Sequence, residues 1–285
     1  MENKLNLHNG GKTVYKTLIF VFCIFLSVLS LFPFIVMIVN STRSTYQIQQ
    51  QAVSLIPSKY FLNNLRILTG KSFNPLTGFA NSLIVSVGTT VCALYFSTLT
   101  AYAIVMYDWK MKKAFFSFIM AVMMIPAQIT IIGFVQMVYK LGMTNNFWIL
   151  ILPAIASPSL VFFMRQYMKP AIPPSLIESA RIDGSKEFFT FNVIALPIMK
   201  PAIATQAIFC FVTAWNDLFR PLTILTKSDY YTLPIMVSLL RGDIYKTEFG
   251  SVYLGLTLTA LPLIIVYLFL SKYIVAGVAM GSVKG

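Results

Sequence analysis

The sequence of 285 residues has few ionisable side chains, and acidic ones are especially scarce. Only 11% of its residues are charged, with nine acidic residues and one histidine, whereas 57% are hydrophobic. An average soluble domain has roughly 25% charged residues. A chain of this composition could not cover its apolar surface in water, so we expect an integral membrane protein whose solvent is lipid.

The scarcity of His, Cys and acidic residues also excludes most catalytic sites. His8 is the only histidine, and Cys23, Cys92 and Cys210 lie in separate apolar runs. We interpret the cysteines as small hydrophobic residues, without a disulfide or a metal site. Residues 11–13 read Gly-Lys-Thr but lack the earlier glycine and the strand of a phosphate-binding loop. We predict that the chain is not an enzyme, has no catalytic or metal-binding residue and binds no nucleotide itself.

The basic residues are dispersed rather than gathered on one face. The net charge is +13, yet Lys and Arg fall singly or in short clusters between apolar runs. This pattern is typical of a membrane protein with basic cytoplasmic loops, and it does not fit a phosphate-binding face. We expect contact with membrane lipid and no binding of nucleic acid.

Several apolar runs reach the length of about 20 residues that crosses a bilayer as a helix. Prolines interrupt some of them, and in lipid a freed carbonyl must be satisfied by a neighbouring helix or a water-lined cavity. We expect packed kinks, with broken helices around a translocation path as the alternative. The chain is thus predicted to be an all-α polytopic membrane protein with about six transmembrane helices. The expected spans are 18–39, 82–105, 114–138, 148–167, 202–222 and 252–270, and the prolines expected to kink or break the first, third, fourth and sixth are Pro33, Pro126, Pro153, Pro158 and Pro262.

The short connecting loops predict the orientation. Lys110, Lys112 and Lys113 lie between the second and third spans, whereas the next loop contains only Lys140. Short cytoplasmic loops are enriched in Lys and Arg. We therefore expect both termini in the cytoplasm.

The segment 169–201 does not read as an ordinary connector. Ser175 and Glu178 have the spacing of a capping box, which predicts a helix starting just after Pro174. Gly184 is placed to end that helix in a left-handed conformation. A second helix is expected from Ser185 towards Pro197, so the loop should form a helix–turn–helix on the cytoplasmic side.

The loop contains Glu178-Ser179-Ala180, then Gly184, then Ile194-Ala195-Leu196-Pro197. In these residues and their spacing it resembles the EAA loop of the membrane subunits of ABC importers. The family pattern is E-A-A, three residues, G, nine residues and I-x-L-P, and serine replaces its second letter here. Other segments resemble the maltose-type sugar permeases, and together the resemblance covers about residues 77–285. The matching segments are Glu178-Ser179-Ala180, Arg181-Ile182-Asp183-Gly184, Ile194-Ala195-Leu196-Pro197, Asn81-Ser82-Leu83, Ala101-Tyr102-Ala103, Trp215-Asn216-Asp217 and the glycines Gly277, Gly281 and Gly285.

The resemblance implies a division of labour among several chains. It implies a type I ABC importer permease fold in the cytoplasmic membrane of a prokaryote. The implied substrate is a carbohydrate, with an oligosaccharide as the favoured kind. The implied partners are a second homologous permease, an extracytoplasmic sugar-binding protein and two ATPase subunits that bind ATP and Mg²⁺. The implied organisation is an N-terminal tail, anchor helix and outer loop at 1–76, a transmembrane core at 77–272 with the EAA loop at 169–201, and a cytoplasmic tail at 273–285.

The resemblance also assigns roles to residues of the loop. In the family, the glutamate of the motif pairs with a basic residue of the ATPase, and that glutamate corresponds to Glu178. Ser179, Ala180, Asp183 and Gly184 would shape the helix and its bend. On the residues alone, capping is the simpler role for Glu178, and the two roles compete for one carboxylate.

A possible substrate path is suggested by Trp215, Asn216 and Asp217, near the outer end of the fifth span. Asp217 and Arg220 have the spacing of a helical ion pair, and ionisable groups at membrane depth are functional candidates. The alternative is that Trp215 anchors the membrane interface while the pair braces the helix end. The outer loop 227–251 would face the sugar-binding protein by resemblance, but on its residues alone it is a solvated loop.

Two other functions are weighed against an ABC importer. An ion-coupled secondary transporter should carry acidic residues in mid-membrane, yet Asp217 is the only acidic residue within an expected span. An intramembrane enzyme lacks a catalytic grouping. Co-purification with an ATPase would separate the importer from both.

Overall fold

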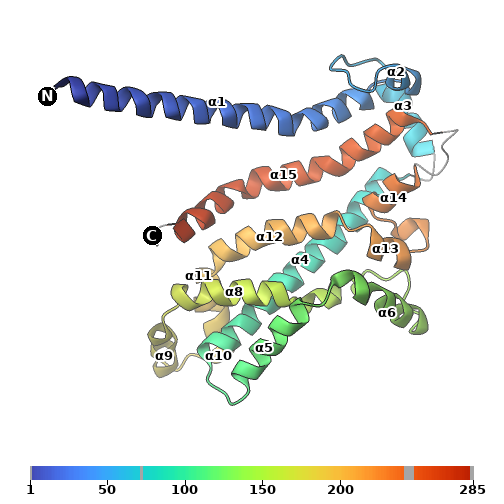
Figure 1. Ribbon diagram of the computed structural model, residues 1–285. Coiled ribbons are helices and arrows are strands. Elements are labelled where there is room, and N and C mark those ends of the chain that lie inside the picture. The colour runs from blue at the N-terminus through green and yellow to red at the C-terminus, as the bar shows by residue number, and fades with distance from the viewer. Residues whose placement is uncertain (1, 71–72, 241–246, 283–285) are drawn as a thin grey trace. The chain divides into compact units, whose positions relative to one another are not determined.

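The computed structural model describes residues 2–70, 73–240 and 247–282, and in these residues the regular elements are all helices (Figure 1). Contacts divide the chain into two compact units, 1–71 with 240–258, and 72–239 with 259–285. Unit 1 contains α1 (Glu2–Ser41), α2 (Thr45–Gln50), α3 (Phe61–Gly70) and the first part of α15 (Phe249–Ser282). Unit 2 contains the rest of α15 together with α4 (Pro75–Met106), α5 (Lys112–Met123), α6 (Ala127–Lys140), α7 (Trp148–Ile151), η1 (Leu152–Ile155), α8 (Pro158–Ala171), α9 (Pro174–Ile182), α10 (Glu187–Phe189), η2 (Thr190–Ala195), α11 (Leu196–Ile198), α12 (Lys200–Trp215), α13 (Phe219–Ile224), η3 (Ser228–Tyr230) and α14 (Leu233–Leu239).

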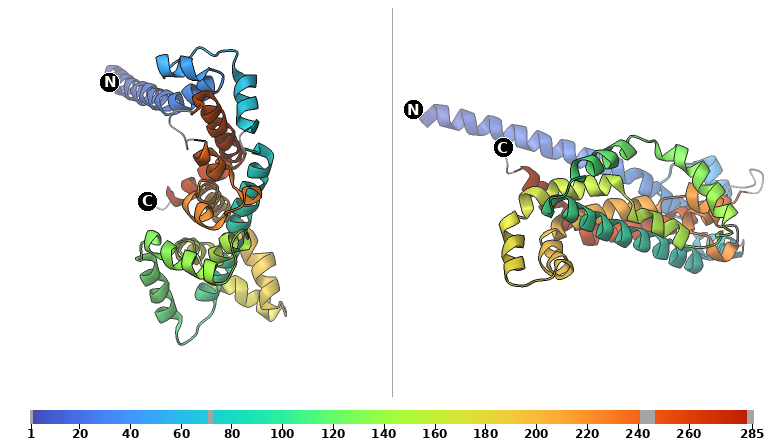
Figure 2. Two further views of the ribbon diagram at one scale, coloured as in Figure 1. Left: turned by 90° about the vertical axis from the view of Figure 1, so that its right-hand side faces the viewer. Right: turned by 90° about the horizontal axis from the view of Figure 1, so that it is seen from below.

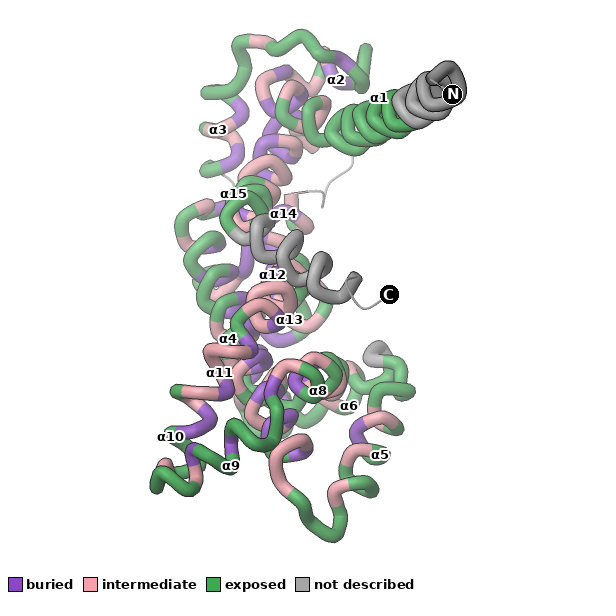
Figure 3. The backbone as a smooth tube through the Cα atoms, turned by 90° about the vertical axis from the view of Figure 1, so that its left-hand side faces the viewer, coloured by how far each residue is buried: buried purple, intermediate pink, exposed green. Residues whose placement is uncertain are grey.

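Helix α1 is apolar and almost uncovered by its own chain. Its segment Tyr15–Ser41 is long enough to cross a membrane, and none of its most apolar part is buried in the structure (Figure 3). Pro33 lies within α1 without ending it. Such a surface requires lipid or another chain around it.

Within the described residues, three uninterrupted helices are long and apolar enough to cross a membrane, and up to five spans result if two bent pairs count as one span each. The uninterrupted ones are Tyr15–Ser41, Pro75–Met106 and Phe249–Phe269. They contain the first, second and sixth expected spans nearly in full. The fourth is the pair Trp148–Ile155 and Pro158–Ala171, bent by 40°.

The third and fifth expected spans differ from the prediction. Residues 114–138 are split into α5 and α6, because Pro126 has no N–H to donate and holds Ile125 out of the helical conformation. The fifth helix, α12, ends at Trp215 rather than continuing to residue 222. Before it, the segment Glu187–Ile198 meets α12 at 79°. The prolines expected to make packed kinks therefore behave differently from one another, since Pro33 and Pro262 stay inside helices.

Helices α4, α8 and α12 form the centre of unit 2 (Figures 1 and 2). Helix α4 begins at Pro75, with Asn74 as its N-cap and proline in the first turn. Its buried face contacts α8 and α12 through a continuous apolar cluster. That cluster contains Ala93, Leu94, Ala101, Tyr102, Leu160, Met164, Met168, Phe191 and Ala202.

The start of α4 is tied to the segment that follows η3. Asn81 donates from Nδ2 to the carbonyls of Asp229 (2.8 Å) and Tyr231 (3.0 Å). Ser82 accepts from the Leu233 amide at 2.9 Å. The Asn-Ser pair noted in the sequence is thus a hydrogen-bonded brace between two distant segments.

Residues 227–251 were expected to be solvated on composition alone, and part of them is packed instead. Helix α14 buries Leu233, Ile235 and Met236 against unit 2. Residues 241–246 of this loop lie outside the described residues, as do residues 283–285 of the expected cytoplasmic tail. The tail from 273 onward continues α15 as far as Ser282. The functional division at residues 76 and 272 stays a prediction, and it differs from the contact-based units, which place 240–258 with the N-terminal segment.

Unit 1 contains a buried polar cluster in a segment where the sequence indicated only a polar loop. The Arg43 side chain is 6% exposed and donates to Asn40 Oδ1 (2.9 Å) and to the carbonyls of Gln51 (2.8 Å) and Gln47 (3.0 Å). Asn64 Nδ2 donates to the carbonyls of Ser41 and Arg43. Each donor in these bonds finds an oxygen, which offsets the cost of burying a cation.

Gly250, in the first turn of α15, packs directly on this cluster. A Cβ at this position would lie 2.4 Å from the Arg43 carbonyl oxygen and 2.5 Å from Asn64 Nδ2. Both neighbours are held by other hydrogen bonds, so neither can move aside cheaply. Only glycine lets the two backbones approach this closely.

Gly250→Ala is therefore expected to destabilise the protein by about 1–3 kcal/mol, the usual range for overpacking. Thermal unfolding of the purified protein in detergent measures this as a lower transition temperature. Gly70→Ala is the matched control, because a Cβ there meets nothing within 4 Å. Equal transition temperatures for the two variants would contradict the packing described here.

Candidate functional site

The loop between α8 and α12 folds as the expected helix–turn–helix at one end of unit 2 (Figures 1 and 2). Its first helix, α9, ends in a glycine turn. Gly184 has φ +79°, its amide donates to the Arg181 carbonyl (3.0 Å), and the Ser185 amide donates to the Ala180 carbonyl (2.9 Å). These two bonds form a Schellman motif, in which the residue with positive φ is usually glycine. The left-handed conformation predicted for Gly184 is confirmed.

The predicted capping box at the start of α9 is wrong. The helix begins at Pro174 and its N-cap is Pro173, which offers no capping side chain. Pro174 already has the φ of the first helical position, so the helix starts one residue before the expected point and Ser175 lies inside it. The Glu178 carboxylate is thereby released from the competing role of capping.

The second helix of the loop contains an unusual stretch. Residues Thr190–Ala195 form a π-helical segment, η2, between α10 and α11. Ser185 Oγ and Thr190 Oγ1 share a hydrogen bond of 2.7 Å at its start. Such one-turn π segments are rare and occur frequently at functional sites.

The loop packs on the Met106 end of α4 through aromatic rings. The Phe191 ring, 1% exposed, lies edge-on to Tyr95 (centroids 5.7 Å apart) and tilted against Tyr102 (5.3 Å). The Tyr95 hydroxyl also donates to Asn192 Oδ1 at 3.2 Å. Ile177 of α9 is 1% exposed and belongs to the same cluster. The loop is therefore anchored to the transmembrane core rather than hanging below it.

Arg181 and Glu187 join the two helices of the loop by an ion pair. Arg181 Nε lies 2.6 Å from Glu187 Oε1, and the Tyr107 hydroxyl donates to Glu187 Oε2 at 2.5 Å. The hydrogen bonds from Arg181 and then from Tyr107 hold the pKa of Glu187 below its usual value. Burial, followed by the Glu187 carboxylate, raises the pKa of Tyr107. Nothing in the sequence pattern pointed to this cluster, because its three residues come from three separate segments.

The predicted coupling residues fall on both sides of α9. Ala180 is buried, whereas Glu178, Ser179, Asp183 and Gly184 are exposed and lie on or next to the outer surface of the helix. Ile182 is 85% exposed beside them. The first part of the loop therefore presents an acidic and apolar surface that its own chain does not cover.

The second predicted group is brought together, but its tryptophan is covered. Trp215 is 1% exposed, stacks on Phe211 (centroids 5.5 Å apart) and donates from Nε1 to the Thr259 carbonyl at 3.1 Å. Asn216 is exposed, and Asp217 Oδ2 lies 2.7 Å from Arg220 Nε. The expected contact between Asp217 and Arg220 is thus confirmed, although Asp217 lies in the break between α12 and α13 and not on one helix with Arg220. The Trp215 ring belongs to the core of unit 2 in this conformation.

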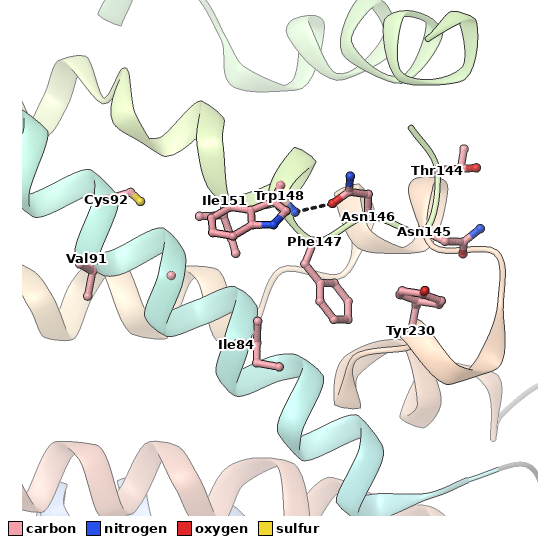
Figure 4. Close-up of a pocket in the computed structure, with 11 residues that line it drawn as sticks. Ile84, Val91, Cys92, Thr144, Asn145, Asn146, Phe147, Trp148, Ile151 and Tyr230 are labelled. Atoms are coloured by element: carbon pink, nitrogen blue, oxygen red, sulfur yellow. Dashed lines mark hydrogen bonds between the residues drawn. The ribbon is translucent and has the colours of Figure 1, made fainter. Parts of the chain in front are cut away.

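The sequence reasoning missed a groove on the Pro75 half of α4 (Figure 4). The groove has a volume of about 730 Å³, which is within the range of ligand pockets. The Phe147 and Tyr230 rings in its lining meet edge to face with their centroids 5.6 Å apart, and Trp148 is 60% exposed. The groove is lined by Ile84, Gly88, Val91, Cys92, Thr144, Asn145, Asn146, Phe147, Trp148, Ile151 and Tyr230. None of the predicted path residues lines it.

The turn that carries these aromatic residues is fixed by one asparagine. Asn145 has φ +56°, and its Oδ1 accepts from the amides of Thr226 (2.8 Å) and Lys227 (2.9 Å). Asn146 Oδ1 in turn accepts from the Trp148 amide at 2.9 Å. The two asparagines set the position of Trp148 at the start of α7.

Comparison with known proteins gives a consistent family. The family model described as "Binding-protein-dependent transport system inner membrane component" matches residues 93–280. An arabinooligosaccharide transport system permease protein of Halalkalibacterium halodurans is 34% identical over 92% of this chain and 94% of that protein. The corresponding permease of Bacillus subtilis is 32% identical over 98% and 99%, and a multiple sugar-binding transport system permease of Streptococcus mutans is 30% identical over 90% and 93%.

A solved structure shares the fold. One chain of a bacterial ABC transporter involved in the import of the acidic polysaccharide alginate has a TM-score of 0.77 and 24% sequence identity, covering 92% of this chain and 96% of that chain. The expected permease fold is confirmed, as is the reading of the chain as a transport subunit rather than an enzyme. Since the family model covers more than half of its residues, the chain belongs to the binding-protein-dependent inner membrane components, the permease subunits of ABC importers, in their carbohydrate-uptake branch.

Proposed function

We propose that this permease imports an oligosaccharide across the cytoplasmic membrane of a prokaryote, with both of its termini in the cytoplasm. The observation that carries the coupling part is the exposed surface of α9, presented on a loop packed against the core helix α4. The similar proteins named for arabinooligosaccharides and multiple sugars support the substrate class. The basic loop at Lys110, Lys112 and Lys113 supports the orientation.

The proposed transporter contains four partner chains besides this permease. A second, homologous permease subunit lines the other side of the path, and two ATPase subunits bind ATP and Mg²⁺ and drive the cycle. An extracytoplasmic sugar-binding protein delivers the substrate to the face that contains residues 227–251. Closure of the ATPases moves the α9 helices and rocks the two permeases between inward- and outward-facing states.

Within this proposal, Glu178 pairs with a basic residue in a cleft of the ATPase. The carboxylate is exposed, free of the capping role and one residue from Ser179 on the same outer surface. Ala180 is buried and anchors α9 below, while Asp183 and Gly184 set the turn that follows. A charge at the centre of a docked helix contributes mainly when it is paired.

Glu178→Lys is expected to abolish coupling in the complete complex. Removing one partner of a buried charge pair costs about 2–5 kcal/mol, and charge reversal adds repulsion. Sugar uptake by proteoliposomes and ATPase activity stimulated by the loaded binding protein should both fall at least roughly tenfold. Lys140→Glu, which reverses an exposed charge at the end of α6 outside the loop between α8 and α12, should leave both near wild type. Wild-type uptake by Glu178→Lys would overturn the assignment.

Gly184→Asp tests the turn rather than the charge pair. An L residue at φ +79° costs about 1–2 kcal/mol, and a second carboxylate beside Asp183 adds like-charge repulsion. Membrane insertion should be intact, while ATP hydrolysis is uncoupled from uptake. Gly184→Asn, which tolerates the left-handed region better, should retain more coupling. Normal transport by Gly184→Asp would count against a coupling role for the turn.

For the substrate path, we propose two surfaces at the outer half of unit 2. One is Asn216 with Asp217, which Trp215 supports from below. The other is the groove at Trp148, whose exposed ring, with Tyr230 and the asparagine amides nearby, offers the apolar face and polar groups that a sugar ring needs.

Trp148→Ala is expected to raise the KM for sugar several-fold, because it removes the exposed ring while leaving α7 in place. The measurement is uptake of labelled arabinotriose, trehalose and lactose by the reconstituted complex. Trp109→Ala is the control, since Trp109 follows the opposite end of α4. An unchanged KM for every transported sugar would remove the groove from the path.

A further inference from the structure

The cluster of Arg181, Glu187 and Tyr107 joins three segments that a coupling movement would have to connect. Arg181 lies in the last turn of α9, Glu187 is the first residue of α10, and Tyr107 directly follows α4. The carboxylate of Glu187 contacts both other residues, at 2.6 Å and 2.5 Å. Arg181 also reaches Oε2 with Nη2 at 3.4 Å. One carboxylate thus ties the end of α9 to the end of α4.

The geometry makes this tie stiffer than an ordinary surface ion pair. Both bonds to Glu187 are charge-assisted, which makes them shorter and stronger than neutral ones. The Arg181 guanidinium also lies 5.1 Å from the centroid of the Tyr107 ring, within the range of a cation–π contact. Arg181 and Tyr107 therefore contact each other as well as the carboxylate. Three mutual contacts fix the relative position of two helix ends.

A second position for the carboxylate is built into the same site. Tyr102 is 2% exposed, and its ring lies edge-on to Tyr107 with centroids 6.0 Å apart. Its hydroxyl is buried without a hydrogen-bond partner among the described residues. The Tyr102 ring thus lies beside the ring of Tyr107, whose hydroxyl binds Glu187. A buried hydroxyl left unpaired is unfavourable, and a small shift of α10 would relieve this.

We propose that Arg181, Glu187 and Tyr107 form a latch that carries movement of α9 to α4, and that Glu187 exchanges Tyr107 for Tyr102 when the latch moves. The proposal rests on the proposed docking of α9 to an ATPase. The latch residues do not touch ATP or sugar; they are positioning residues. Their effect is to make α9 and α4 move together, so that displacement at the cytoplasmic end opens or closes the path beside α4.

The two halves of the latch can be removed separately. Tyr107→Phe keeps the ring beneath Arg181 but loses the hydroxyl, and Glu187→Gln keeps an oxygen acceptor but loses the charge. Tyr95→Phe is the matched control. It deletes the neutral bond of 3.2 Å from Tyr95 to Asn192, which joins α4 to η2 of the same loop, and leaves the latch intact.

The experiment compares uptake and ATP hydrolysis in the complete reconstituted complex, using labelled arabinotriose, trehalose and lactose. For Tyr107→Phe and Glu187→Gln we expect hydrolysis stimulated by the loaded binding protein to persist while sugar imported per ATP falls several-fold. Tyr95→Phe should keep the wild-type ratio. Wild-type ratios in both latch variants would overturn the latch.

Hydrogen exchange of the backbone amides distinguishes the position in which Glu187 binds Tyr107 from the one in which it binds Tyr102. In the resting complex, Tyr107→Phe should speed exchange across residues 181–187, whereas Tyr102→Phe should leave it unchanged and lower only the turnover rate. An unchanged turnover rate in Tyr102→Phe would overturn the second position.

The outcome for Glu178→Lys distinguishes failure of the docking proposal from failure of the latch. If that variant couples normally, the docking proposal fails; if it is uncoupled while both latch variants couple normally, only the latch fails.

Discussion

The packing of the α8–α12 loop against the end of α4 is the contact on which the rest of unit 2 depends. Phe191 fills the space between Tyr95 and Tyr102, and the same apolar cluster continues into α8 and α12. Helix α4 therefore receives the loop at one end and lines the groove at the other. A helix with 32 residues spans about 48 Å at 1.5 Å per residue, so a rigid α4 connects events on the two sides of a membrane.

Lipid as the solvent explains where sequence reasoning succeeded. Length and apolarity predict the long helices well, because a membrane-spanning backbone must satisfy its own hydrogen bonds and cannot remain irregular. The helices around Pro33 and Pro262 were found for this reason. Pro126 is the exception: it ends a helix that the apolar run alone would have continued, and its neighbours Met124 and Ile125 are 83% and 52% exposed.

The helix–turn–helix between α8 and α12 was predictable because its information is local. The positive φ of Gly184 follows from a glycine at the end of an amphipathic segment, and the spacing of the motif identified the family. The start of α9 was misjudged by one residue, since Pro174 competes with Ser175 for the beginning of the helix and is better suited to the first helical position. The groove, the Arg43 cluster and the Tyr107–Glu187 bond could not be predicted. The groove and the Tyr107–Glu187 bond join residues far apart in the chain, whereas the Arg43 cluster lies within residues 40–64. All three depend on side-chain positions that a single sequence does not encode in any short pattern.

The π-helical segment Thr190–Ala195 determines how the residues that follow it are rotated about the helix axis. A π turn accommodates one residue more than an α turn, and one residue corresponds to a rotation of about 100° around a helix axis. If the segment relaxed to an α-helix without losing a residue, Leu196 and Pro197 would turn by about that angle relative to Phe191. The π conformation therefore holds Leu196 and Pro197 in their present orientation, and a substitution that favoured the α conformation here would shift them as much as one inserted residue shifts the rest of an ordinary α-helix.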